Sequence, residues 1–304
     1  MSWYYILLIV IGSVLLAAII LILSVSYLIA RFSIAKPARY KREEQKVYNH
    51  QMGFDLGTET MTRTPIEFKM NDGYVLHGDY SLVKGSKKFC LLCHGHRSSR
   101  EGALRYSVLF RELGYSTIIY DQRSHGDNIH KTVTMGYQES KDLSAVIDEV
   151  YEKFGKDIYL GLQGVSMGAA TVLLSTKYQQ KVKFIVSDCS YSYLKDVIRD
   201  MIRRYHLPSK ILLPFINFYL KTLYHFSFDD ASPINCIASN KIPVLFIHGQ
   251  DDLFINVKAV EELYEKATSK KELVIFKNAG HASSLTVNRE LYKKSLTEFL
   301  SSID

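Results

Sequence analysis

The chain has 304 residues, 47% of them apolar, with 38 Lys and Arg against 31 Asp and Glu. A chain of this length and apolar content fills a sizeable core in one large or two small domains, which excludes a disordered protein. Its four cysteines exclude a small disulfide-built fold, since such folds are dense in cysteine.

The first thirty residues carry no Asp, Glu, Lys or Arg. About twenty apolar residues are enough to cross a bilayer as a helix, and Trp3 and Tyr27 lie where interfacial aromatic rings would anchor its two ends. A cleaved signal peptide is the alternative, but it would have a basic segment ahead of a shorter apolar core. We therefore expect a retained transmembrane helix over residues 1–30.

A basic segment follows this helix. Residues 31–46 hold six Lys or Arg against Glu43 and Glu44. The positive-inside bias predicts a single-pass protein of the cell membrane with its C-terminal domain in the cytoplasm, and the basic residues would be attracted to anionic headgroups. We expect residues 31–61 to form a basic juxtamembrane linker.

Residues 62–304 alternate between short β-branched runs and longer helical patterns. This alternation predicts an α/β domain with a mostly parallel sheet flanked by helices, and the turn at Asn71–Gly73 adds an antiparallel hairpin. The predicted strands are Ile66–Met70, Tyr74–Tyr80, Phe89–Cys93, Thr117–Tyr120, Ile158–Leu162, Phe184–Ser187, Val244–Ile247 and Leu273–Phe276. The predicted helices lie near 101–113, 138–154, 167–179, 256–268 and 283–301.

The motif G-x-S-x-G follows the strand Ile158–Leu162 and precedes a helical run. A nucleophile on a sharp strand-to-helix turn needs neighbours without bulk two residues before and two after, which Gly164 and Gly168 provide. The sequence therefore predicts Ser166 as a nucleophile, rather than a glycine-flanked serine in an ordinary loop.

Two later strands end in the partners that such a serine needs. Asp252 follows the strand Val244–Ile247, with Asp251 as the alternative acid, and His281 follows Leu273–Phe276. A serine hydroxyl becomes a good nucleophile when an imidazole takes its proton, and a carboxylate orients that imidazole. The order Ser, Asp, His along the chain is the one expected on this kind of sheet.

These motifs resemble those of the α/β-hydrolase superfamily, in particular its small serine esterase and prolyl-oligopeptidase-like branches. The resemblance covers about residues 62–302 and includes the segments Cys93–Ser99, Asp121–Gly126, Pro243–Gly249 and Asn278–His281. It implies Ser166, Asp252 and His281 as a catalytic triad. It also implies an oxyanion hole formed by the backbone N–H groups of His96 and Met167.

Other polar residues in these segments have simpler interpretations. His94, His248, His125 and Asp121 are expected to brace turns at strand ends. Cys90 and Cys93 form C-x-x-C inside a predicted strand, so their side chains should point to opposite faces and bind no zinc. We expect no metal and no cofactor, and no nucleic acid partner, because the excess positive charge is concentrated beside the membrane.

Residues 190–240 interrupt the alternation with two aromatic-rich helical segments around Pro208 and Pro214. A small helical cap over the site is one interpretation, and helices packed on their own sheet are the other. The sequence thus predicts a membrane-anchored serine hydrolase of carboxylic esters, with a small-molecule or lipid ester as substrate. The alternatives are a peptidase or thioesterase with the same triad, and a catalytically silent binding module.

Overall fold

The computed structural model describes residues 2–36, 42–54, 57–58, 61–129 and 131–303. The described residues form one eight-stranded sheet in the order β1-β2-β4-β3-β5-β6-β7-β8. Strands β3 to β8 are parallel to one another, while β1 pairs with β2 and β2 with β4 in antiparallel fashion. The bounds are β1 Thr64–Lys69, β2 Val75–Ser81, β3 Lys88–Cys93, β4 Ser116–Tyr120, β5 Tyr159–Val165, β6 Phe184–Asp188, β7 Val244–Gly249 and β8 Lys271–Phe276. The predicted mostly parallel sheet is confirmed.

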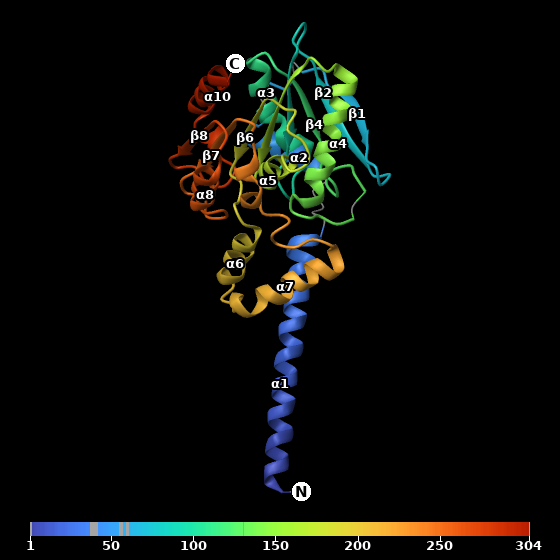
Figure 1. Ribbon diagram of the computed structural model, residues 1–304, viewed down its shortest axis with the longest axis vertical. Helices are drawn as coiled ribbons and strands as arrows, with labels where there is room; N and C mark the ends of the chain where they lie inside the picture. The colour runs from blue at the N-terminus through green and yellow to red at the C-terminus, as the bar shows by residue number, and fades with distance from the viewer. Residues whose placement is uncertain (1, 37–41, 55–56, 59–60, 130, 304) are drawn as a thin grey trace.

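Helices cover both faces of this sheet (Figure 1). One face is buried by α4, α5 and α8, and the other by α3 and α10. The domain helices are η2 Arg100–Ala103, α3 Leu104–Glu112, α4 Tyr137–Phe154, α5 Met167–Ser175, η3 Pro233–Asn235, η4 Ile237–Ser239, α8 Lys258–Lys266, α9 Ser284–Val287 and α10 Arg289–Ile303. Because strands covered on both faces expose neither, β3 to β7 are almost wholly buried.

The two cysteines of the C-x-x-C segment lie on opposite faces of β3, as predicted. Cys93 packs in the cluster under α4 and α5, and Cys90 packs in the cluster under α3 and α10. Both side chains are fully buried. They therefore serve as core residues and cannot chelate one ion together.

The N-terminal helix α1, Trp3–Leu28, projects from the body as a stem (Figure 1). It is long and apolar enough to cross a membrane. A π-helical segment, Ile29–Ala35, continues it directly into the domain, where Val133 donates a backbone hydrogen bond to Ala35. Arg39 and Lys41 of the basic segment lie outside the described residues.

The predicted cap region holds two helices, α6 Leu194–Arg204 and α7 Ser209–Tyr224. They lie at the base of the body, and α7 crosses α1 there (Figure 1). The rings of Tyr27 and Tyr219 meet at 5.6 Å between centroids, and the hydroxyl of Ser26 donates to the carbonyl of Leu212. Residues 190–240 are thus packed between the domain and the stem.

Helix α2, Arg42–Gln51, lies within the segment expected to be a linker and is docked on the domain. The Asn49 amide donates to the carbonyl of Glu101 at 2.7 Å, and Gln45 accepts from the Ser98 hydroxyl at 3.2 Å. Arg42 and Arg63 both bond the buried carboxylate of Glu101. These contacts attach α2 to the loop that follows β3.

Candidate active site

Three side chains predicted as a triad lie at the carboxyl edge of the sheet. Ser166 follows β5, Asp252 follows β7 and His281 follows β8. Parallel strands bring their carboxyl ends to one edge, where sites in open α/β sheets are built. The cap helix α6 also begins at this edge, because it follows the carboxyl end of β6.

Ser166 stands on a strained turn between β5 and α5. Its φ of 55° and ψ of −118° are a conformation that non-glycine residues rarely adopt. The backbone is crowded on both sides: a Cβ at Gly164 would lie 2.2 Å from the carbonyl oxygen of Gly168, and a Cβ at Gly168 would lie 2.2 Å from that of Cys93. The glycines of the motif are therefore required by packing, as the sequence predicted.

A continuous line of hydrogen bonds joins the three side chains. The Nε2 of His281 lies 2.9 Å from the Oγ of Ser166, and its Nδ1 lies 2.7 Å from the Oδ2 of Asp252. A carboxylate only accepts, so Nδ1 carries the proton and the lone pair of Nε2 faces the serine hydroxyl. This is the tautomer that a general base needs.

The acid in this line is Asp252, and Asp251 is exposed to solvent with its N–H bonded to Ala279. Burial alone would raise the pKa of Asp252. Hydrogen bonds from His248, His281 and the Ile255 N–H outweigh burial and hold that pKa well below its usual range. Asp252 is therefore ionised at neutral pH and can stabilise a protonated His281.

The loop after β3 passes directly over the nucleophile. A Cβ at Gly95 would lie 3.4 Å from the Cβ of Ser166, so the next residue, His96, is close to the serine. Met167 is the first residue of α5, where a backbone N–H has no partner within its own helix. Within the described residues, no hydrogen bond uses the N–H of either His96 or Met167. The two N–H groups predicted as oxyanion donors are thus unpaired in the described part of the chain.

His94 and Asp121 brace the loops at the ends of β3 and β4. His94 donates from Nδ1 to the Gly95 carbonyl and accepts the Gln122 N–H at Nε2. Its burial lowers its pKa to about 4, so it stays neutral. Asp121 accepts hydrogen bonds from Arg100 and from the Asp127 N–H, which braces the turn after β4.

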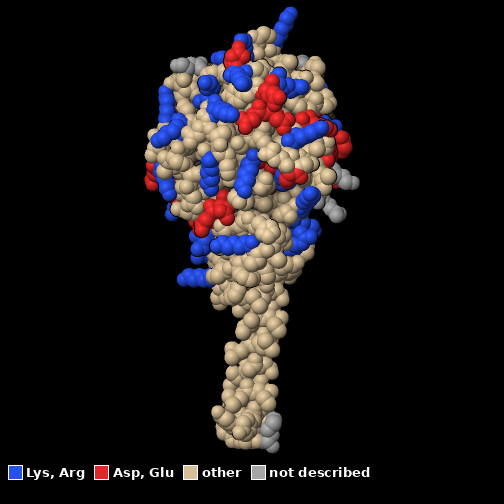
Figure 2. Space-filling model, turned by 45° about the vertical axis from the view of Figure 1, so that its right-hand side comes forward, with Lys and Arg blue, Asp and Glu red and all other residues tan. Residues whose placement is uncertain are grey.

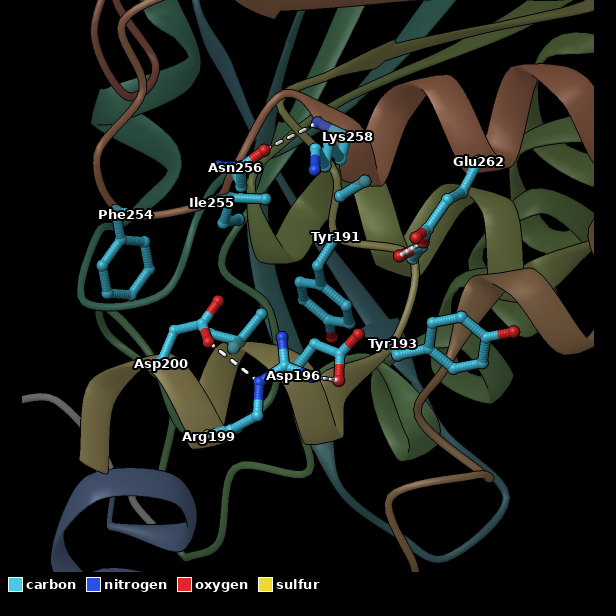
Figure 3. Close-up of a pocket in the computed structure, with 13 residues that line it drawn as sticks. Tyr191, Tyr193, Asp196, Arg199, Asp200, Phe254, Ile255, Asn256, Lys258 and Glu262 are labelled. Carbon is cyan, nitrogen blue, oxygen red and sulfur yellow. Dashed lines mark hydrogen bonds and ion pairs between the residues drawn. The ribbon is translucent and has the colours of Figure 1, made fainter. Parts of the chain in front are cut away.

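His281 lines one cavity, and a second cavity lies on the far side of its neighbour Phe254. The first, of about 370 Å³, is lined by His281, Arg97 and Arg105 together with Tyr48 of α2 and Met52 of the turn that follows it. The second, of about 210 Å³, lies between the loop after β7 and the cap helix α6. Figure 3 shows it with Phe254 at one edge, and the ring of Phe254 contacts the imidazole of His281 at 5.0 Å between centroids.

One cluster near the triad has the composition of a metal site. The ligand atoms of Cys189, Asp252 and His281 lie within 4.8 Å of one another. Asp252 and His281 are already bonded to each other, and burial raises the pKa of the Cys189 thiol well above its usual value. A neutral thiol is a poor ligand, so the residues do not favour a metal here, and its absence stays a prediction.

Three features of the site were not predicted from the sequence. His248 lies 3.4 Å from the Oδ2 of Asp252, and Phe254 packs on His281. The carbonyl of Asp188 accepts the N–H of Ser166 at 2.9 Å, while its carboxylate is capped by the hydroxyls of Tyr106 and Tyr292. Only the position of Asp188 at the end of β6 hinted at such a role.

Comparisons with known proteins define the class. Residues 119–282, more than half of the chain, match a family model described as Serine hydrolase (FSH1). The chain therefore belongs to this family of serine hydrolases and is a hydrolase. The match includes Ser166, Asp252 and His281.

Particular proteins and solved structures are similar to this chain. The Bacillus subtilis protein YqkD, described as uncharacterized, is 34% identical over 249 residues, which are 81% of this chain and 82% of YqkD. The Pyrococcus furiosus esterase Pf2001 superposes with a TM-score of 0.65 and 25% identity, covering 84% of this chain and 94% of the esterase. Thiohydrolase aneE of Aspergillus aculeatus is 24% identical over 135 residues, 43% of this chain and 42% of aneE. The resemblance to the α/β-hydrolase superfamily is confirmed.

Proposed function

We propose that this chain is a membrane-anchored hydrolase that cleaves carboxylic esters through an acyl-enzyme on Ser166. The observation that carries the proposal is the unbroken line from Ser166 through His281 to Asp252, with bonds of 2.9 and 2.7 Å. The three residues follow three different strands, so hydrogen bonding between neighbours in the sequence does not account for this arrangement.

The chemistry follows from this geometry. The Oγ of Ser166 attacks the ester carbonyl while Nε2 of His281 takes the hydroxyl proton, and the N–H groups of His96 and Met167 bind the resulting oxyanion. The tetrahedral intermediate collapses, and His281 returns the proton to the departing alcohol. Water, activated by the same imidazole, then releases the acid and restores the serine.

A second candidate substrate is a thioester. The relative from Aspergillus aculeatus is named a thiohydrolase. The triad performs the same steps on either bond, since only the leaving group changes. A panel of esters and thioesters graded by chain length distinguishes the two, and the faster class is the natural one.

We also propose that α1 anchors the enzyme in the cell membrane with the domain in the cytoplasm. The helix is long and apolar enough to cross a membrane, and its residues Trp3–Leu21 are all exposed. Lys36, Arg42 and Lys46 follow on the domain side, as the positive-inside bias requires. Protease treatment of intact cells tests the orientation, because a cytoplasmic domain is protected until the membrane is opened.

The catalytic proposal is tested with Ser166→Ala. We expect hydrolysis of a short p-nitrophenyl ester to fall by about 10⁴-fold or more, with an unchanged melting temperature. A fluorophosphonate probe should label the wild-type chain and leave the variant unlabelled. An unlabelled but folded wild-type chain, or a Ser166→Ala chain that retains full activity, would contradict the proposal.

A further inference from the structure

The cap carries an exposed apolar stripe that the triad does not explain. Ile211, Phe215 and Phe218 follow one another at helical spacing on α7, and Phe218 is 57% exposed. The opposite stripe of α7 is buried against the domain and the end of α1. Large apolar side chains gathered on one exposed face mark a site of interaction. We call this surface the cap face, with the exposed Tyr205 and Leu207 of the preceding turn as its remaining members.

The sequence that forms the cap face is basic. Residues 201–228 contain no Asp or Glu, whereas Arg203, Arg204, Lys210 and Lys221 are all exposed. Figure 2 shows Lys and Arg side chains gathered at the base of the body, where the apolar stem begins. An apolar stripe bordered by basic residues complements a lipid surface with anionic headgroups.

The position of α7 along α1 agrees with this partner. The part of α1 that no other segment covers, Trp3–Leu21, is about 28 Å long at 1.5 Å per residue. This length matches the hydrocarbon layer of about 30 Å. From Ile22 onward α1 is packed against α7. If α1 spans the bilayer, α7 therefore lies at the level of the headgroups.

We propose that the cap face binds the surface of an anionic bilayer and holds the catalytic edge against it. This inference rests on the proposed membrane anchoring, and it adds a second membrane contact made by the cap itself. Met167, next to the nucleophile, packs in the same apolar cluster as Ile216 and Leu220 of α7. The cap thus lies between the lipid surface and Ser166, which favours esters that reside in the bilayer as substrates.

The contact is tested with tryptophan as a depth probe in the full-length chain. Trp3 is the only tryptophan, so Trp3→Phe gives a background for Phe218→Trp and for the control Leu82→Trp. Leu82 is exposed and follows β2 at the amino edge of the parallel strands, far from the cap. The proteins are reconstituted in vesicles of phosphatidylcholine and phosphatidylglycerol with brominated acyl chains.

We expect bromine to quench Phe218→Trp roughly twofold or more, since an interfacial helix enters the acyl boundary, and to leave Leu82→Trp nearly unchanged. Emission from position 218 that is red-shifted and not quenched would show that the cap face is exposed to water. Unquenched, blue-shifted emission would show a face covered by protein, such as a second copy of this chain. Either result overturns the proposal.

An activity measurement separates this proposal from the proposed function. Phe215→Asp with Phe218→Asp should lower hydrolysis of a vesicle-embedded ester roughly tenfold while leaving a soluble p-nitrophenyl ester unaffected, and Leu82→Asp should change neither. If the double variant hydrolyses the embedded ester as fast as the wild-type chain does, the proposed role of the cap face is wrong. A wild-type chain inactive on the soluble ester would instead contradict the proposed function, and the quenching result would still stand.

Discussion

His248 and His281 approach the same oxygen of Asp252: the Nε2 of His248 lies 3.4 Å from Oδ2, and the Nδ1 of His281 lies 2.7 Å from it. His248 also donates from Nε2 to the carbonyl of Ile255 at 2.9 Å. A carbonyl only accepts, so Nε2 carries a proton, and this N–H group lies beside the carboxylate of Asp252. His248 is therefore a positioning residue for the acid.

We predict that a donor at position 248 matters more than the ring itself. His248→Phe keeps a ring but removes the donor, and should lower kcat/KM about tenfold, as expected for a lost hydrogen bond of about 1.5 kcal/mol. His248→Gln keeps an N–H donor and should retain most of the activity. Steady-state kinetics on a soluble ester checks this, and equal losses in the two variants would reduce the role of His248 to packing.

Asp252→Asn should lower kcat by about 10⁴-fold, because the amide holds His281 in the wrong tautomer. Asp251→Asn is the matched control and should leave kcat unchanged, since that residue is exposed and the Nδ1 of His281 bonds Asp252 instead. A large loss in Asp251→Asn would show that the acid is misassigned.

The pH dependence of stability reports on the same carboxylate. The pKa of Asp252 is lower in the folded chain than its unfolded value of about 3.9, so the ionised group stabilises the fold above about pH 4. That stabilisation is lost as the pH falls further. The gap in melting temperature between wild type and Asp252→Asn should therefore be largest near pH 7 and shrink below pH 4. A gap that widens in acid would contradict the assigned charge.

The oxyanion role of His96 rests on its backbone and can be separated from its side chain. His96→Pro removes the N–H and should reduce kcat by about 10²–10³-fold, whereas His96→Ala keeps the N–H and should stay near wild type. Burial lowers the pKa of the His96 imidazole to about 3, so no charge is lost in either variant at neutral pH. Similar kcat values for the two folded variants would exclude this N–H as a donor.

Arg100 should be the most sensitive position in the buried ion network beside the site. Its guanidinium bonds Asp79 at 3.0 Å, Asp127 at 2.8 Å and the fully buried Asp121. Arg100→Leu leaves buried carboxylates unpaired and should cost about 3–5 kcal/mol of unfolding free energy. Breaking the exposed pair of Lys87 and Asp157 with Lys87→Met should cost less than about 1 kcal/mol. Urea unfolding of both variants makes the comparison.

The sequence predicted the parts of this enzyme that local rules determine. All eight strands were predicted. The buried parallel strands are continuous apolar runs, and the antiparallel pair was predicted from the turn at Asn71–Gly73. Ser166, Asp252 and His281 could be predicted as a triad because each follows the end of a strand, and the structure brings their side chains together. The sequence did not decide between Asp251 and Asp252 as the acid. These two residues are adjacent in the loop after β7, and the path of that loop determines which carboxylate faces the imidazole.

Polar contacts between residues far apart in the chain could not be predicted from the sequence. Helix α2 is polar, and it docks through Asn49 and Arg42 on Glu101, more than fifty positions away. No periodicity indicates such a partner, because the hydrogen bonds depend on where the loop after β3 passes. The bond of His248 to the acid was missed for the same reason: its side chain had to be placed relative to a loop that bends back.

The unbroken connection from α1 through residues 29–35 into the domain has a kinetic consequence. With α7 packed against α1 as well, the domain of a chain anchored as we propose has little freedom to swing away from the bilayer. Such an enzyme searches for substrate by lateral diffusion in a plane. Its rate should then follow the mole fraction of substrate among the lipids, and inert lipid would dilute the reaction even at constant total substrate.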